Sequence, residues 1–168
     1  MNNRIQQTII GGLAATLVMT MIMFLAPMMG LPKMNTGQML SMMLGVPIVV
    51  GWIMHFMIGI VFAFSYTLLF SNVVSKISNK ILKGAIFGMA VFVFAQISMV
   101  SMGAMMGGMP PMEGSMFLLM LGSILGHVAY GVVVTLFVTE YAKTWQDVIS
   151  KFNILKCAKK QGWGELST

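Results

Sequence analysis

The sequence predicts an all-α polytopic membrane protein with four transmembrane helices, arranged as two repeated hairpins and followed by an amphipathic C-terminal helix. Three observations carry this prediction. Of the 168 residues, 58% are hydrophobic and 8% are charged, whereas a water-soluble domain carries roughly 25% charged residues. The few charged residues leave long uncharged gaps, and ten basic residues stand against four acidic ones. This composition excludes a soluble globular domain and also a disordered chain, which would be poor in apolar residues.

The uncharged gaps set the spans, because a transmembrane helix needs about 20 apolar residues. Gaps of 28, 29 and 26 residues each hold one span, and a gap of 42 residues holds a polar stretch and then a span. The polar stretch, residues 34–45, is predicted to form a short helix at the membrane surface with Asn35 or Thr36 as its N-cap. Pro47 suits the first turn of the helix that follows. The predicted spans are about 8–29, 47–70, 82–104 and 115–139.

The basic residues predict the orientation of the chain. Nine of the ten fall on one side of a four-span protein, and Lys33 falls on the other. Because cytoplasmic loops carry the excess of Lys and Arg, both termini are predicted to lie in the cytoplasm. The net charge of +6 is therefore interpreted as a topological signal and not as a sign of nucleic-acid binding.

Residues 1–140 are predicted to form the transmembrane domain and residues 141–168 a basic cytoplasmic tail. Two interpretations of the tail remain open: an amphipathic helix on the inner leaflet, or a solvated helix that continues the fourth span. Neither implies a specific ligand. The single cysteine, Cys157, excludes an internal disulfide framework. The apolar residues of the tail recur at spacings of four and three, at Tyr141, Trp145, Val148, Phe152 and Leu155.

The two halves of the transmembrane region resemble each other. A histidine followed four residues later by a glycine occurs in the second and the fourth span, and an earlier glycine precedes each histidine by 44 or 43 residues. Because each hairpin starts on the same side, the two copies would share one orientation, related by an axis along the membrane normal. The histidines would then lie at matching depths in the outer half of the membrane. The residues are Gly11, His55 and Gly59 in the first half and Gly84, His127 and Gly131 in the second.

Several short motifs recur in a known family. They are Gly12-Leu13-Ala14-Ala15-Thr16, Leu25-Ala26-Pro27, Gly30-Leu31-Pro32, Gly51-Trp52 to His55-Phe56, Ile58-Gly59 and Leu125-Gly126-His127 to Tyr130-Gly131. With these motifs the chain resembles a family of small bacterial and archaeal membrane proteins that is catalogued as a domain of unknown function. The resemblance covers about residues 8–140. It implies four helices and a prokaryotic cytoplasmic (inner) membrane, and it implies no activity.

His55 and His127 form the candidate site, because an ionisable side chain inside a membrane is a functional-site hypothesis by default. In an up-down-up-down bundle the second and fourth helices run parallel and commonly sit diagonally across the core, where two imidazoles can approach each other. Gly59 and Gly131 lie one turn further along the same helix faces. A missing side chain there would either let another helix come close or leave room for a flat ligand.

Two ligand chemistries fit paired imidazoles: axial ligation of b-type haem, or binding of a transition metal such as Cu or Zn. Against haem, Lys33 is the only nearby cation for the propionates; against zinc, no Cys or carboxylate lies at that depth to complete four ligands. The structural alternative makes His55 an interfacial residue beside Trp52 and gives His127 a hydrogen-bond partner on another helix. The candidate partners of His127 are Gln96, Ser98, Ser101 and Thr20.

The methionines are concentrated towards the predicted outer face, where 14 of the 21 lie. Thioethers are soft ligands that favour Cu(I), so the dense group Met105, Met106, Met109 and Met112 adds candidate metal ligands to the histidine pair. The alternative is that methionine acts as a flexible apolar filler or as a partner surface.

The residues do not support an enzyme. No Ser–His–acid or Cys–His set is visible, and the four acidic residues lie at or beyond the ends of the spans. Intramembrane charges and broken helices, which are typical of channels and transporters, are not found either. Two function classes remain. The first is a non-catalytic accessory or scaffold subunit, in contact with the bilayer and with other membrane subunits or further copies of itself. The second is a ligand-binding membrane protein that holds b-type haem or Cu at His55 and His127.

Overall fold

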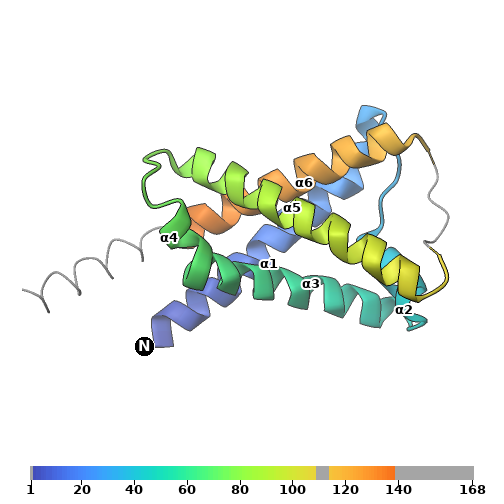
Figure 1. The fold of residues 1–168 in the computed structure, drawn as a ribbon, viewed down its shortest axis with the longest axis horizontal. Coiled ribbons are helices and arrows are strands. Elements are labelled where there is room, and N and C mark those ends of the chain that lie inside the picture. The colour runs from blue at the N-terminus through green and yellow to red at the C-terminus, as the bar shows by residue number, and fades with distance from the viewer. Residues whose placement is uncertain (1, 109–113, 139–168) are drawn as a thin grey trace, which may run out of the picture.

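The computed structural model describes residues 2–108 and 114–138 of the chain. Every regular element within these ranges is a helix, which confirms the all-α fold class (Figure 1). The predicted amphipathic helix of the tail, residues 141–168, lies outside the described residues.

Four long helices cover the four segments in which spans were expected, and each is long and apolar enough to cross a membrane. The first ends in a 3₁₀ turn, and the second ends in a π-helical segment followed by one short helical turn. The elements are α1 (Asn2–Leu25), η1 (Ala26–Met29), α2 (Thr36–Leu44), α3 (Ile48–Ser65), η2 (Tyr66–Phe70), α4 (Ser71–Val73), α5 (Lys80–Met105) and α6 (Met116–Val138).

Helix α2 is the short helix that was expected between the first and second spans. Asn35 is its N-cap, because the side-chain Oδ1 accepts a hydrogen bond of 2.9 Å from the backbone N–H of Gln38. Gly45 ends the helix at φ 64°, in the left-handed region that favours glycine. Helix α2 lies across the start of α3, where the indole of Trp52 packs against Gly37.

The four long helices form a bundle in the order α3, α1, α6, α5. Helix α1 packs against both α3 and α6, and α6 packs against both α1 and α5. Aromatic side chains close the remaining side between α3 and α5, with the ring centroids of Phe62 and Phe94 5.5 Å apart. This order leaves α3 and α6 at opposite corners, as expected for the second and fourth spans. The N terminus and α4 lie at one end of the bundle and α2 at the other (Figure 1).

A long side chain connects the two opposite corners. Tyr130 of α6 is buried in the core, and its hydroxyl donates a hydrogen bond to the backbone carbonyl of Gly59 on α3. Around it lie Tyr66 and Phe87, whose ring centroids are 4.8 Å apart. The core therefore joins the first hairpin to the second through side chains rather than through close backbone contact between α3 and α6.

The first hairpin, α1 with α3, packs through small residues. A Cβ added at Gly12 of α1 would lie 3.0 Å from the Cα of Ile60 and 3.0 Å from the Cβ of Ala63 on α3. One turn further along α1, Thr16 occupies the space beside Gly59, so that a Cβ at Gly59 would collide with the Thr16 hydroxyl. The two backbones can approach closely only because Gly12 and Gly59 have no side chain.

The second hairpin, α5 with α6, packs through the corresponding positions, 72 residues later in the chain. A Cβ at Gly84 of α5 would collide with the Cα of Val132 and would lie 2.6 Å from Oγ1 of Thr135 on α6. One turn further along α5, Gly88 lies beside Gly131, where a Cβ on either residue would collide with backbone atoms of the facing helix. Both hairpins thus use the same packing positions.

The structure corrects the proposed equivalence between the two halves by one residue. Gly12, and not Gly11, occupies the position that Gly84 has in the second hairpin. Gly11 faces a different helix, where an added Cβ would lie 3.1 Å from the Cβ of Phe137 on α6. Two consecutive glycines made the spacing ambiguous in the sequence, and only the facing helix distinguishes them.

Candidate functional site

His55 lies on α3 and is 7% exposed. Its Nε2 is 3.2 Å from the hydroxyl oxygen of Thr20 on α1. That hydroxyl is already a donor, because it lies 2.8 Å from the backbone carbonyl of Thr16 and gives its hydrogen to that oxygen. Thr20 can therefore only accept from the imidazole, and the network assigns the ring proton of His55 to Nε2.

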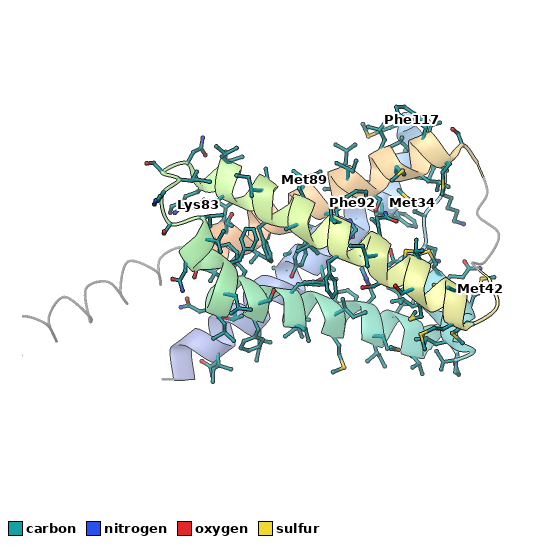
Figure 2. All side chains as sticks on the ribbon, in the orientation of Figure 1. Met34, Met42, Lys83, Met89, Phe92 and Phe117 are labelled. Carbon is teal, nitrogen blue, oxygen red and sulfur yellow. The ribbon has the colours of Figure 1, made fainter. Side chains whose placement is uncertain are left out.

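His127 lies on α6 and is 9% exposed. Its Nδ1 is 2.8 Å from the backbone carbonyl oxygen of Ser123, one turn earlier on the same helix. Because a carbonyl can only accept, the ring proton of His127 belongs on Nδ1. The ring of Phe92, labelled on α5 in Figure 2, meets the imidazole edge-on with centroids 5.7 Å apart.

The hydrogen-bond partners proposed for His127 are wrong. Thr20 bonds to His55 instead, and the Ser98 hydroxyl donates to the carbonyl of Phe94 on its own helix at 2.9 Å. Ser98 and Ser101 are exposed, and the amide of Gln96 makes no hydrogen bond with any residue that the structure describes. The rotation of α5 about its axis directs these side chains away from His127.

The two imidazoles do not touch. Neither a hydrogen bond nor a ring contact joins them within the described part of the chain. Since Nε2 of His55 and Nδ1 of His127 carry the ring protons, the free lone pairs lie on Nδ1 of His55 and Nε2 of His127. The site therefore presents two basic nitrogens in the membrane-spanning part of the bundle.

The glycines beside the histidines are occupied by neighbouring helices. A Cβ at Gly59 would collide with Thr16 of α1, and a Cβ at Gly131 would collide with the backbone of Gly84 on α5. The missing side chains at Gly59 and Gly131 therefore let another helix come close and do not leave room for a flat ligand. The faces that would have to receive a porphyrin are filled, so the residues present do not fit b-type haem.

The methionine group that follows the third span is only partly described. Met105 and Met106 end α5 and the turn after it and are exposed, while Met109 and Met112 lie outside the described residues. Sulfur atoms gather at the end of the molecule that carries α2, opposite Lys83 (Figure 2). Among the described residues no group of three or more His, Cys, Asp or Glu side chains comes together.

Sequence reasoning missed two buried methionines of α1 that pack against α6 beside His127; the sulfur of Met23 accepts a hydrogen bond of 3.4 Å from the hydroxyl of Thr36. Met19 and Met23 of α1 are buried and pack against Gly126, the residue before His127. A Cβ at Gly126 would lie 2.8 Å from Cε of Met23 and 3.4 Å from Cγ of Met19. The available signal was their spacing of four residues, with Thr20 between them, which places all three on one side of α1.

Comparison with known proteins gives the family and no activity. No curated protein and no solved structure matches the sequence. Residues 2–148 match a family described as a "Family of unknown function (DUF6789)". This match covers most of the chain and includes both histidines, in agreement with the resemblance expected from the motifs. The chain therefore belongs to the DUF6789 family of proteins of unknown function.

Proposed function

We propose that the protein is a non-catalytic scaffold subunit that assembles with further copies of itself in a prokaryotic cytoplasmic membrane. The proposed scaffold is a duplicated helical hairpin with both termini in the cytoplasm. The shared packing positions of the two hairpins support duplication, and the positive-inside rule supports the orientation. Lys80 and Lys83 begin α5 at the end of the bundle that also carries α4, whereas Lys33 precedes α2 at the opposite end (Figure 1).

The observation that carries the proposal is the amide of Gln96. This side chain is half-buried within the span α5 and makes no hydrogen bond with any residue that the structure describes. Hydroxyls on the same bundle behave differently: Ser98 donates to the carbonyl of Phe94, and Ser65 donates to the carbonyl of Phe62. Transfer of an unpaired amide from water into hydrocarbon costs several kcal/mol, so Gln96 needs a partner that the described residues do not supply.

Gln96 belongs to an otherwise apolar face of α5. Met89, Val93, Gln96 and Val100 follow one another at spacings of four, three and four residues and therefore share one side of the helix. The three apolar members are exposed; Met89 is labelled in Figure 2. We call these four residues the Gln96 face.

A second copy of the chain fits the Gln96 face because the amide group is self-complementary. Each amide offers two N–H donors and one carbonyl acceptor, so two Gln96 side chains related by a two-fold axis satisfy each other. Interhelical hydrogen bonds of this kind stabilise association in membranes by about 0.6 to 2 kcal/mol.

Cysteine cross-linking in native membranes tests the proposal. In a Cys157→Ser background, Val93→Cys places a thiol on the Gln96 face, and the matched control Val61→Cys places one on the lipid-facing side of α3. The two valines have similar exposure, 51% and 63%. We expect Val93→Cys to form disulfide-linked dimers on mild oxidation and Val61→Cys to remain monomeric. Adding Gln96→Leu to Val93→Cys should reduce the dimer by at least half.

Three results would overturn the scaffold proposal. Equal cross-linking at both positions would indicate random collision in the bilayer, and no cross-linking at Val93→Cys would show that this face is not shared between copies. A dimer that persists unchanged with Gln96→Leu would remove the observation on which the proposal rests.

A further inference from the structure

We propose that the end of the bundle that carries α4 binds the phosphate of an anionic phospholipid headgroup. The site is the connection from α4 to α5 together with the first turn of α5, residues 74–83, which we call the lysine loop. Its cations are Lys76, Lys80 and Lys83. The site lies within a single chain and does not depend on the association of copies through the Gln96 face.

The first step of the argument is the positive charge of the lysine loop. Residues 2–108 and 114–138 contain no Asp or Glu, so no carboxylate of the described residues pairs with the three lysines. Cations so close together in the chain repel one another and attract anions. An anionic group that the described residues do not supply is therefore stabilised here.

The second step is the order of the lysine loop. Val74 is buried in the core, and Ile77 packs against the same core. The backbone N–H of Val74 donates to the carbonyl of Phe70, and the N–H of Ile77 donates to the carbonyl of Val74, both at 3.1 Å. Between these two anchors Ser75 and Lys76 are exposed. The loop thus presents its polar side chains from a fixed backbone, which lowers the entropy cost of binding.

The third step is the start of α5, which is also fixed. The side chain of Asn79 caps this helix, because its Oδ1 accepts from the backbone N–H groups of Ile81 and Leu82 at 2.9 and 3.3 Å. The hydroxyl of Thr135 on α6 lies 3.2 Å from the backbone carbonyl of Lys80. Since the cap already satisfies two N–H groups of the first turn, the attraction for an anion comes from the lysine side chains.

The fourth step is the depth of the lysine loop in the membrane. It joins two segments that are long and apolar enough to span, Ile48–Val73 and Lys80–Met105, and so lies where acyl chains meet headgroups. Val73 and Ile81 on either side are exposed apolar residues. Lys83, labelled in Figure 2, is partly buried, and a lysine there covers apolar surface with its stem while its ammonium group reaches the headgroups. A lipid brings its phosphate to this depth.

The chemistry of the lysine loop favours an anionic headgroup over a zwitterionic one. Ammonium groups bind phosphate through charge-assisted hydrogen bonds. The hydroxyls of Ser75 and Ser78 are exposed, make no hydrogen bond with a described residue and add further donors. Phosphatidylcholine carries its own cation beside the phosphate, whereas phosphatidylglycerol does not. The lysines therefore select phosphatidylglycerol.

Native mass spectrometry of the full-length protein in mild detergent tests the site, with phosphatidylglycerol and phosphatidylcholine added at equal concentrations. We expect the wild type to retain phosphatidylglycerol in preference by roughly tenfold or more, because each lysine near an anionic lipid adds to the attraction. Replacing all three lysines, Lys76→Gln with Lys80→Gln and Lys83→Gln, should abolish the preference. Arginine at the same three positions should preserve it.

A pair of single variants controls for the change in net charge. Lys76 and Lys33 are both exposed, and Lys33 precedes α2 at the opposite end of the bundle. Lys76→Gln should lower the preference for phosphatidylglycerol roughly fivefold, and Lys33→Gln should leave it unchanged. A wild type without a preference would overturn the proposal, and so would equal losses in the two variants.

Thermal unfolding keeps the proposal falsifiable if the triple variant fails to fold. Phosphatidylglycerol should raise the Tm of the wild type above its value in phosphatidylcholine, and Lys76→Gln should reduce this rise. Inorganic phosphate at the same phosphate concentration should give no rise; an equal rise would identify the free ion as the ligand and overturn the assignment to a lipid. A Lys76→Gln variant that loses as much stability in phosphatidylcholine as in phosphatidylglycerol would show that this lysine serves contacts within the chain, which also contradicts the proposal.

Discussion

The two hairpins share their packing positions and differ in what fills them. On α1, Thr16 and Thr20 stand at the positions that Gly88 and Phe92 occupy on α5, 72 residues later. Close backbone approach is therefore common to both halves, whereas the residue that meets the histidine from the neighbouring helix is Thr20 in the first half and Phe92 in the second. The distance between the helices and the chemistry around the histidines are therefore set by different residues. Glycines set the distance between helices, and the neighbouring residues decide which ring nitrogen of each histidine is protonated.

The largest expected effect is the loss of stability when alanine replaces Gly131, compared with the loss when it replaces Gly59. In Gly131→Ala the new Cβ meets backbone atoms of Gly84 and Gly88, which cannot move unless the helices separate. In Gly59→Ala it meets the hydroxyl of Thr16, which belongs to a side chain. Overpacking costs about 1 to 3 kcal/mol, and we expect Gly131→Ala near the upper limit and Gly59→Ala near the lower one. Thermal unfolding in detergent measures both.

A second substitution sharpens this contrast. Thr16→Ala removes the hydroxyl that the Cβ of Gly59→Ala would meet, so the double variant should be more stable than Gly59→Ala alone. The second hairpin allows no such rescue, because Gly88 has no side chain to remove. Equal destabilisation by Gly59→Ala and Gly131→Ala, or failure of the rescue, would contradict the difference between the hairpins.

An intermediate effect is expected where the two hairpins are joined. Tyr130→Phe removes the hydroxyl that donates to the carbonyl of Gly59 and should lower the free energy of unfolding by about 1 kcal/mol. Tyr66→Phe is the matched control, because Tyr66 is equally buried and its hydroxyl makes no hydrogen bond with a described residue. If Tyr66→Phe destabilised the protein as much as Tyr130→Phe does, the connection between the hairpins would not depend on this hydrogen bond.

The smallest effect concerns the acceptors of the two imidazoles. Thr20→Val removes the side-chain acceptor of His55 and should cost about 0.6 kcal/mol, the average for such bonds in membranes. Ser123→Ala should be nearly neutral, because it removes only the long contact of 3.4 Å between the Ser123 hydroxyl and Nδ1 of His127, and the backbone carbonyl that accepts from His127 at 2.8 Å remains. Comparison of the two unfolding curves tests this assignment, and a Ser123→Ala variant that loses as much stability as Thr20→Val would refute it.

The sequence was sufficient to predict the spans and the surface helix, because these depend on composition and on local chemistry. Uncharged gaps located the four long helices, and Asn35 was correctly proposed as one of two candidate caps of α2. The π-helical segment Tyr66–Phe70 was not predicted. It contains no Pro or Gly that would mark a departure from regular helix.

The contacts between helices were predicted less well, because they depend on how each helix is rotated about its axis. The histidines were selected as ionisable residues inside the second and fourth spans, and the structure buries both, but Thr20 was proposed as a partner for the wrong one. The spacing to Gly11 was one residue out of register with the hairpin contacts. The bond from Tyr130 to Gly59 and the two buried methionines beside the site were missed, since no local pattern specifies a partner on another helix.

The most direct test of the account is the protonation state of the two histidines, which are the only ones in the chain. Nitrogen-15 NMR of protein labelled at histidine, with His55→Gln to assign the signals, reports which ring nitrogen carries hydrogen. The account predicts opposite tautomers: a proton on Nε2 of His55, donated to Thr20, and a proton on Nδ1 of His127, donated to Ser123. The same tautomer at both sites would contradict the claim that two hairpins with one packing scheme hold their imidazoles in different ways.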